Sequence, residues 1–151
     1  MNPGPATVFG FDFGKKRIGI AVGQTLTASA RPLDTVRVQN GEPDWEAIGR
    51  LIQSWRPAQL IVGLPTQLDD SEHPLAAAVQ RFAAELQRRY ALEVHLVDER
   101  LSSHAAAQIA ATVGGRGAPQ SQAAKETLDR IAAQVILETW LAEQSYGRQA
   151  L

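Results

Sequence analysis

Hydrophobic and polar residues follow one another in two different patterns along the chain, and the first pattern is typical of β-strands. Two short runs near the start are rich in β-branched, aromatic and glycine residues, and the four residues between them, Phe13-Gly14-Lys15-Lys16, predict a hairpin turn. Leu60-Ile61-Val62 is a continuous apolar run, as expected of a strand that is buried on both faces, and residues 94–97 predict another buried strand. The five predicted strands are residues 7–12, 17–22, 35–38, 60–62 and 94–97.

The second pattern places apolar residues three or four positions apart, which predicts helices. Trp45, Ile48, Ile52 and Trp55 share one face of the first helix, which stops at Arg56-Pro57. Pro in a first turn, serine caps and paired glycines mark the ends of the others. The four predicted helices are residues 45–56, His73-Pro74 to about 86, Ser102 or Ser103 to 114, and about 122–144, with a loop at 113–120.

This order of elements predicts an α/β fold with a mixed five-stranded sheet and helices on both faces. With 151 residues, of which 44% are hydrophobic and 21% charged, we expect one domain over 1–151 with flexible ends at about 1–6 and 145–151. The absence of cysteine excludes disulfides, thiol nucleophiles and zinc–thiolate sites. No signal peptide or membrane span is apparent, so we expect a cytoplasmic protein.

Three acidic residues occupy positions where acids are unfavourable for folding. Asp12 ends the first strand, Glu99 follows the fifth, and Asp129 lies within the last helix between Leu128 and Ile131. Strands that end at the same edge of a sheet would bring Asp12 and Glu99 together. Each acid, taken alone, can also be read as an ordinary strand-end, cap or surface residue.

Helical spacing adds a separate argument for Asp129. Ala132, Ala133, Ile136 and Trp140 share its helix face, which indicates that its carboxylate points toward the sheet. We therefore expect the three carboxylates to lie within roughly 8 Å of one another and to bind Mg²⁺ or Mn²⁺, two ions in the full two-metal scheme. The bound cation would offset their mutual repulsion.

Basic residues near these acids are candidate phosphate ligands. Lys15, Lys16 and Arg17 form a basic turn beside Asp12 that either holds a phosphate backbone or is simply solvated. Arg100 either pairs with Asp98 or contacts substrate phosphate. Arg116 is either solvated or part of a loop that clamps substrate. A net charge of −1 means that nucleic acid would have to bind at such a local patch.

These motifs, in this order, closely resemble the YqgF/RuvX family. The resemblance is carried by residues 11–23, by Val62-Gly63-Leu64-Pro65, by residues 97–103 and by residues 125–137 with Asp129. It implies a ribonuclease H-like fold related to the RuvC Holliday-junction resolvases, and a role in maturing the 5′ end of the small-subunit ribosomal RNA precursor. It also implies that Asp12, Glu99 and Asp129 are the acidic active-site residues.

The function predicted from these observations is a metal-dependent nuclease that hydrolyses phosphodiester bonds, with RNA favoured as substrate and DNA or a branched junction as further candidates. We expect a monomer or homodimer that acts on pre-16S rRNA, with the pre-ribosomal particle as a candidate partner. The main alternative is a nucleic-acid-binding factor that keeps the fold and uses the acids structurally. Phosphotransfer is a third hypothesis, because Phe11-Asp12-Phe13-Gly14 also resembles the phosphate loop of actin and hexokinase, but those proteins need two lobes.

Overall fold

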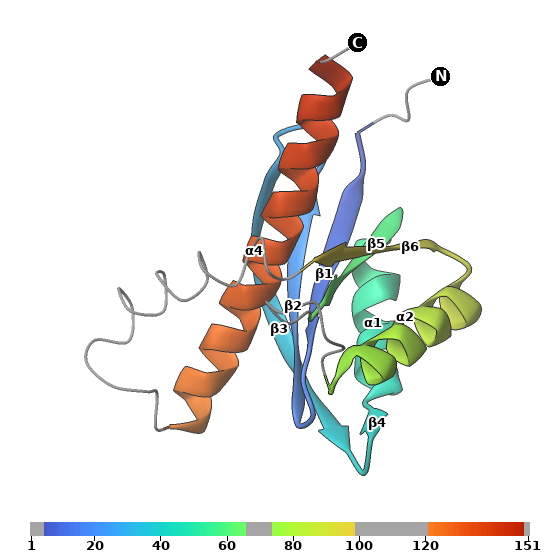
Figure 1. Cartoon of the computed structure of the whole chain (residues 1–151), viewed down its shortest axis with the longest axis vertical. Helices are drawn as coiled ribbons and strands as arrows, with labels where there is room; N and C mark the ends of the chain where they lie inside the picture. The colour runs from blue at the N-terminus through green and yellow to red at the C-terminus, as the bar shows by residue number, and fades with distance from the viewer. Residues whose placement is uncertain (1–4, 66–73, 99–120, 150–151) are drawn as a thin grey trace.

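A computed structural model describes residues 5–65, 74–98 and 121–149, with side chains as far as Gln144 in the last segment. Six strands form one mixed sheet in the order β4-β3-β2-β1-β5-β6 (Figure 1). The first four strands in the chain pair antiparallel, whereas β5 pairs parallel with both β1 and β6. The strands are β1 Thr7–Phe13, β2 Arg17–Gln24, β3 Ser29–Gln39, β4 Glu42–Pro43, β5 Gln59–Leu64 and β6 Glu93–Asp98.

Three helices are described, and they cover opposite faces of the sheet. The helices α1 (Trp45–Trp55) and α2 (Ala76–Tyr90) pack on one face, and the long helix α4 (Gln122–Gln149) crosses the other (Figure 1). The predicted α/β class and the two-sided helical cover are therefore confirmed. The helix predicted from Ser102 or Ser103 and the loop predicted at 113–120 lie outside the described residues.

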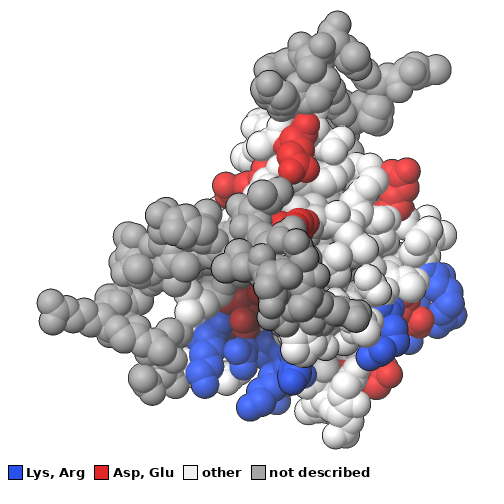
Figure 2. Space-filling model, in the orientation of Figure 1, with Lys and Arg blue, Asp and Glu red and all other residues white. Residues whose placement is uncertain are grey.

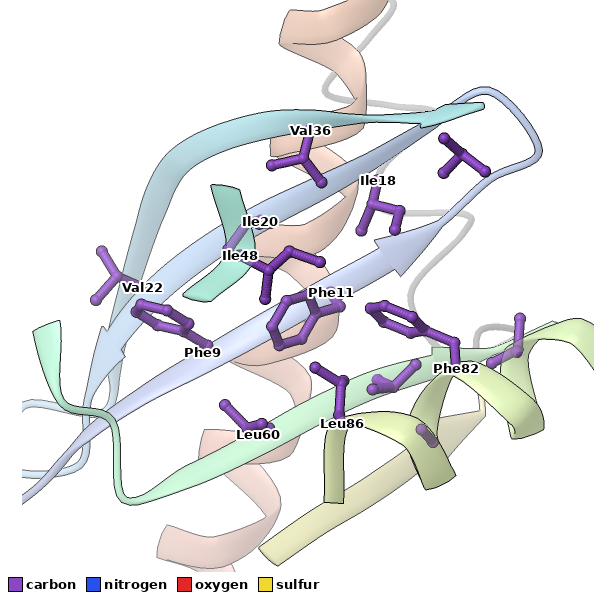
Figure 3. Close-up of a cluster of buried hydrophobic side chains, with 14 residues drawn as sticks. Phe9, Phe11, Ile18, Ile20, Val22, Val36, Ile48, Leu60, Phe82 and Leu86 are labelled. Carbon is purple, nitrogen blue, oxygen red and sulfur yellow. The ribbon is translucent and has the colours of Figure 1, made fainter. Parts of the chain in front are cut away.

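Alternation along the strands sorts their side chains into two cores. Phe9 and Phe11 of β1 point to the α1/α2 face, where they pack against Ile48 and Phe82 (Figure 3). Val8 points to the α4 face, where Ile136 and other α4 residues cover it. Because successive residues of a strand face opposite sides, Asp12 belongs to the α4 face with Val8.

The sheet is larger than the sequence predicted. All five predicted strands are present, but β3 extends over Ser29–Gln39 rather than residues 35–38, and the two-residue strand β4 adds a sixth at the edge. Most β3 side chains are exposed or only half-buried, so the strand carries little of the apolar signal on which the prediction relied. A register shift between Ile20 and Ala21 of β2 accommodates the irregular pairing near Pro32.

Helix boundaries also differ in two places. The first helix is confirmed: Asp44 caps it by accepting a hydrogen bond from the backbone N–H of Ala47, and Arg56 ends it in a left-handed conformation. The second begins at Ala76 rather than at Pro74, which lies in the preceding turn. The last continues to Gln149, beyond the predicted end near Gln144. Among the described residues, no helix is long and apolar enough to cross a membrane.

Candidate active site

Asp12 lies near the end of β1, on the face that α4 covers. Its cross-strand partner is Gly19 of β2, and antiparallel partners have Cα atoms about 4.5–5.5 Å apart. Asp12 is half-buried and has an interaction partner in the structure. The strand β6 ends nearby in the sheet at Asp98, the residue before Glu99 in the chain. Glu99 itself lies outside the described residues.

Gly19 also explains how Asp129 reaches the site. A Cβ atom built on Gly19 would lie 1.9 Å from the backbone oxygen of Asp129, so only a glycine allows α4 to approach β2 this closely. Gly10 likewise allows α4 to approach β1 closely, because a Cβ atom built on Gly10 would lie 2.8 Å from the Cβ of Leu137. Asp12 and Asp129 are therefore both neighbours of Gly19, on the same face of the sheet.

Polar contacts position α4 along β3 as well. The Thr35 hydroxyl donates a hydrogen bond to the Glu126 carbonyl at 3.1 Å, and Arg130 donates to the Thr35 hydroxyl at 3.3 Å. One turn farther on, the Gln134 amide donates to the Ala30 carbonyl at 3.1 Å. These contacts secure the part of the helix that carries Asp129.

The Asp129 carboxylate points to the sheet side of α4, as its helical spacing predicted. Ala133, Ile136 and Trp140 of the same face are buried against the sheet. The Nε–H of Arg17 donates a hydrogen bond to Oδ2 of Asp129 at 2.6 Å, and the two side chains are only 20% and 21% exposed. Sequence analysis did not find this contact, which joins residues 112 positions apart.

Burial and Arg17 shift the pKa of the Asp129 carboxyl in opposite directions. Burial raises its pKa above the ordinary value of 3.8, because the charged form loses hydration, and the nearby Glu126 adds to the rise. The hydrogen bond and positive charge of Arg17 lower the pKa, as does Arg130, but burial dominates. Asp129 is thus a carboxylate whose charge the fold stabilises only in part.

Asp12 and Asp129 fit a hard divalent cation in the chemistry of their donors. Both offer carboxylate oxygens on one face of the sheet, the ligand type that Mg²⁺ and Mn²⁺ prefer. The contact with Arg17 is made by Oδ2 of Asp129. No group of three His, Cys, Asp or Glu side chains that could hold a metal is present in the described ranges, which leave out the third predicted ligand, Glu99.

The predicted phosphate ligands are only partly within the described residues. Lys15 and Lys16 are exposed on the β1–β2 turn, and Arg37 is the cross-strand partner of Arg17. Lys and Arg side chains gather at this end of the molecule (Figure 2). Arg100 and Arg116 lie outside the described residues, so their assigned contacts stay predictions.

The strand order and the helical cover define a class of fold, the ribonuclease H-like fold of RuvC type. The structure is similar to Thermus thermophilus RuvC in complex with a Holliday junction substrate, with a TM-score of 0.51 and 20% identity over 93% of this chain and 96% of that one. It is also similar to fowlpox virus resolvase with Holliday junction DNA, with a TM-score of 0.53 and 12% identity over 91% and 98% of the two chains.

Within this class, residues 6–143 match the family described as RuvX, Holliday junction resolvase, and the chain belongs to that family. Two curated relatives carry the name "Putative pre-16S rRNA nuclease". The protein from Legionella pneumophila strain Philadelphia 1 is 52% identical over 134 residues, which cover 89% of this chain and 94% of the relative. The protein from Nitrosococcus oceani is 47% identical over 143 residues, with 93% and 89% covered.

Proposed function

We propose that this protein is a metal-dependent nuclease that processes the 5′ end of pre-16S rRNA. The observation that carries the proposal is the placement of Asp12 and Asp129 beside Gly19 on one face of the sheet. Glu99 completes the site in this proposal, because it directly follows Asp98, the last residue of β6, in the chain. The name of the relatives supports the choice of RNA.

The three acids, Asp12, Glu99 and Asp129, would be the ligands of one or two Mg²⁺ or Mn²⁺ ions. When bound, such cations would activate a water molecule and stabilise the leaving oxygen. The protein's own part is to fix Asp12 on the strand β1 and Asp129 on the helix α4. Lys15, Lys16 and Arg100 would bind backbone phosphates, and Arg116 would be a further substrate contact.

The test is cleavage of a pre-16S rRNA 5′-end fragment by Asp12→Asn in Mg²⁺. Asn keeps the shape of Asp but lacks the charge that a hard cation requires, so the rate should fall by roughly 10³-fold or more. Asp34→Asn is the matched control, since Asp34 is exposed on β3 and bonds its own neighbour Thr35. If Asp12→Asn cleaves like the wild type, Asp12 is not a metal ligand.

The ion pair between Arg17 and Asp129 favours one alternative, a nucleic-acid-binding factor without catalysis, because it gives Asp129 a structural partner. Turnover separates the two hypotheses. A panel of single-stranded RNA, single-stranded DNA and a four-way junction, each with Mg²⁺, Mn²⁺ or EDTA, should show metal-dependent product from RNA. Binding without product in every lane would establish the binding factor instead. We expect the active species to be a cytoplasmic monomer or homodimer.

A further inference from the structure

Arg17 holds the same carboxylate that the proposed metal site needs. Its Nε–H lies 2.6 Å from Oδ2 of Asp129, and both side chains are about four-fifths buried, so water screens their charges poorly. A guanidinium on one oxygen places a positive charge within a few ångströms of any cation on the other. The two cations would repel each other at this distance.

We propose that Arg17 is an internal counter-ion that occupies Asp129 in the metal-free protein and is released when a divalent cation binds. This inference rests on the proposed function, whose site it extends. Arg17 directly follows Lys15 and Lys16, which the proposed function assigns to substrate phosphate. The released guanidinium would bind the same phosphate backbone, because a guanidinium binds phosphate in a bidentate manner.

In this proposal the divalent cation replaces the Arg17 guanidinium at the Asp129 carboxylate. Before metal binds, Arg17 offsets the charge of Asp129, which burial would otherwise destabilise. After metal binds, the guanidinium moves to substrate phosphate. Divalent cation and nucleic acid therefore bind with positive coupling, since each stabilises the arrangement that the other prefers.

The first test measures Mn²⁺ binding by calorimetry at pH 8 without nucleic acid. Arg17→Gln and Arg17→Met remove the competing charge and should bind Mn²⁺ roughly two- to fivefold more tightly, the range that an ion pair of this kind accounts for. Arg17→Lys keeps the charge and should resemble the wild type. Arg37→Met is the matched control, because Arg37 is the cross-strand neighbour of Arg17, whereas Arg17 forms the ion pair with Asp129.

The second test measures binding of a short fluorescein-labelled single-stranded RNA in Ca²⁺ or in EDTA. In EDTA, Arg17→Gln should bind like the wild type, because Arg17 is engaged by Asp129. In Ca²⁺, the wild type should gain affinity and Arg17→Gln should remain about tenfold weaker, the loss of one charged hydrogen bond. Melting curves without metal establish that each variant is folded.

Each other outcome has a definite meaning. Equal or weaker Mn²⁺ binding by both neutral variants overturns the counter-ion role, and so does an equal gain in Arg37→Met. An Arg17→Gln variant that gains as much RNA affinity in Ca²⁺ as the wild type overturns the release to phosphate. If the wild type binds no Mn²⁺, the proposed metal site fails together with this inference. If Mn²⁺ binding follows the prediction but no RNA is cleaved, only the proposed function fails.

Discussion

At the scale of single residues, the site depends on a balance between burial and charge at Asp129. Burial raises the pKa of its carboxyl, and the Arg17 guanidinium offsets this rise only in part. The folded protein therefore binds a proton at Asp129 more tightly than the unfolded chain does. Between the pKa of Asp129 in the unfolded chain and its higher pKa in the folded protein, the free energy of unfolding falls as the pH rises.

Asp129→Asn should for this reason raise the melting temperature of the metal-free protein at pH 7. Asn is nearly isosteric with the protonated carboxyl, so the variant avoids the cost of the buried charge. The difference should disappear as the pH falls through the folded pKa toward the ordinary value of 3.8. Melting curves in EDTA over pH 3.5–8 measure this, and saturating Mg²⁺ should reverse the order by stabilising only the wild type.

Glu46→Gln is a suitable comparison for that series. Glu46 is an exposed acid that pairs with Arg50 on α1, far from the site in the fold. Its substitution should change stability by less than about 0.5 kcal/mol and with little dependence on pH in the same range. If Asp129→Asn is less stable than the wild type at pH 7 without metal, the ion pair outweighs the cost of burial.

At the scale of elements, the contact between α4 and β2 fixes the geometry of the site. Small residues, Gly19, Ala21 and Gly23, line the β2 face under α4, whereas Ile18 and Ile20 fill the other face. A helix can approach a strand closely only where side chains are this small. The same closeness brings the Asp129 backbone to Gly19.

Gly19→Ala should therefore destabilise the fold strongly, by about 1–3 kcal/mol or more, because its Cβ would overlap the Asp129 carbonyl. Gly49→Ala makes the same chemical change inside α1, where the new Cβ would lie 3.4 Å from the Tyr90 hydroxyl. Alanine is the better helix former, so this variant should be neutral or more stable by up to about 1 kcal/mol. Urea denaturation of both variants measures the two changes in the free energy of unfolding, which should have opposite signs or differ strongly in size.

The same elements show which features of the fold can be predicted from the sequence and which cannot. Apolar runs predicted β1, β2, β5 and β6, and helical spacing predicted α1 and the sheet-facing side of Asp129, because those signals come from burial. The length of β3 was not predictable in this way, since its exposed side chains are specified by pairing with β2. The Arg17–Asp129 contact depends on the docking of α4. The only feature of the sequence that points to this docking is the alternation of small and bulky residues in β2, which marks the face that α4 covers.

At the scale of the whole molecule, charge is distributed unevenly. The net charge is only −1, yet Lys and Arg side chains gather around the β1–β2 turn (Figure 2). Such a patch binds phosphates without reading bases, and its affinity falls steeply with salt. Nucleic acid should consequently approach the molecule from the end that carries the acids.

Lys15→Gln and Lys16→Gln should each lower the slope of log affinity against log salt by about 0.7 for single-stranded RNA. Arg50→Gln, which removes an exposed positive charge from α1, should leave the slope unchanged. Fluorescence anisotropy in Ca²⁺ over a salt series measures all three variants. A slope that responds equally to Arg50→Gln would mean that RNA binds the opposite face as well.

The choice of divalent ion separates binding from chemistry. Mg²⁺ requires octahedral coordination at about 2.1 Å, whereas Ca²⁺ takes more ligands at about 2.4 Å. In-line attack depends on strict alignment, so Mg²⁺ or Mn²⁺ should support cleavage and Ca²⁺ should support binding with little product. Gel assays with each ion check this, and equal rates in Ca²⁺, EDTA and Mg²⁺ would exclude a catalytic metal site.

The position of Asp129 on α4 has a consequence for the order in which activity appears. Every strand of the sheet precedes α4 in the chain, so during synthesis the sheet can pair while one of its faces is still bare. Until α4 emerges and docks, Arg17 has no acid to hold and Asp12 lacks its neighbour. Under the proposed function, hydrolytic activity should therefore appear only after α4 has docked, with the final folding step.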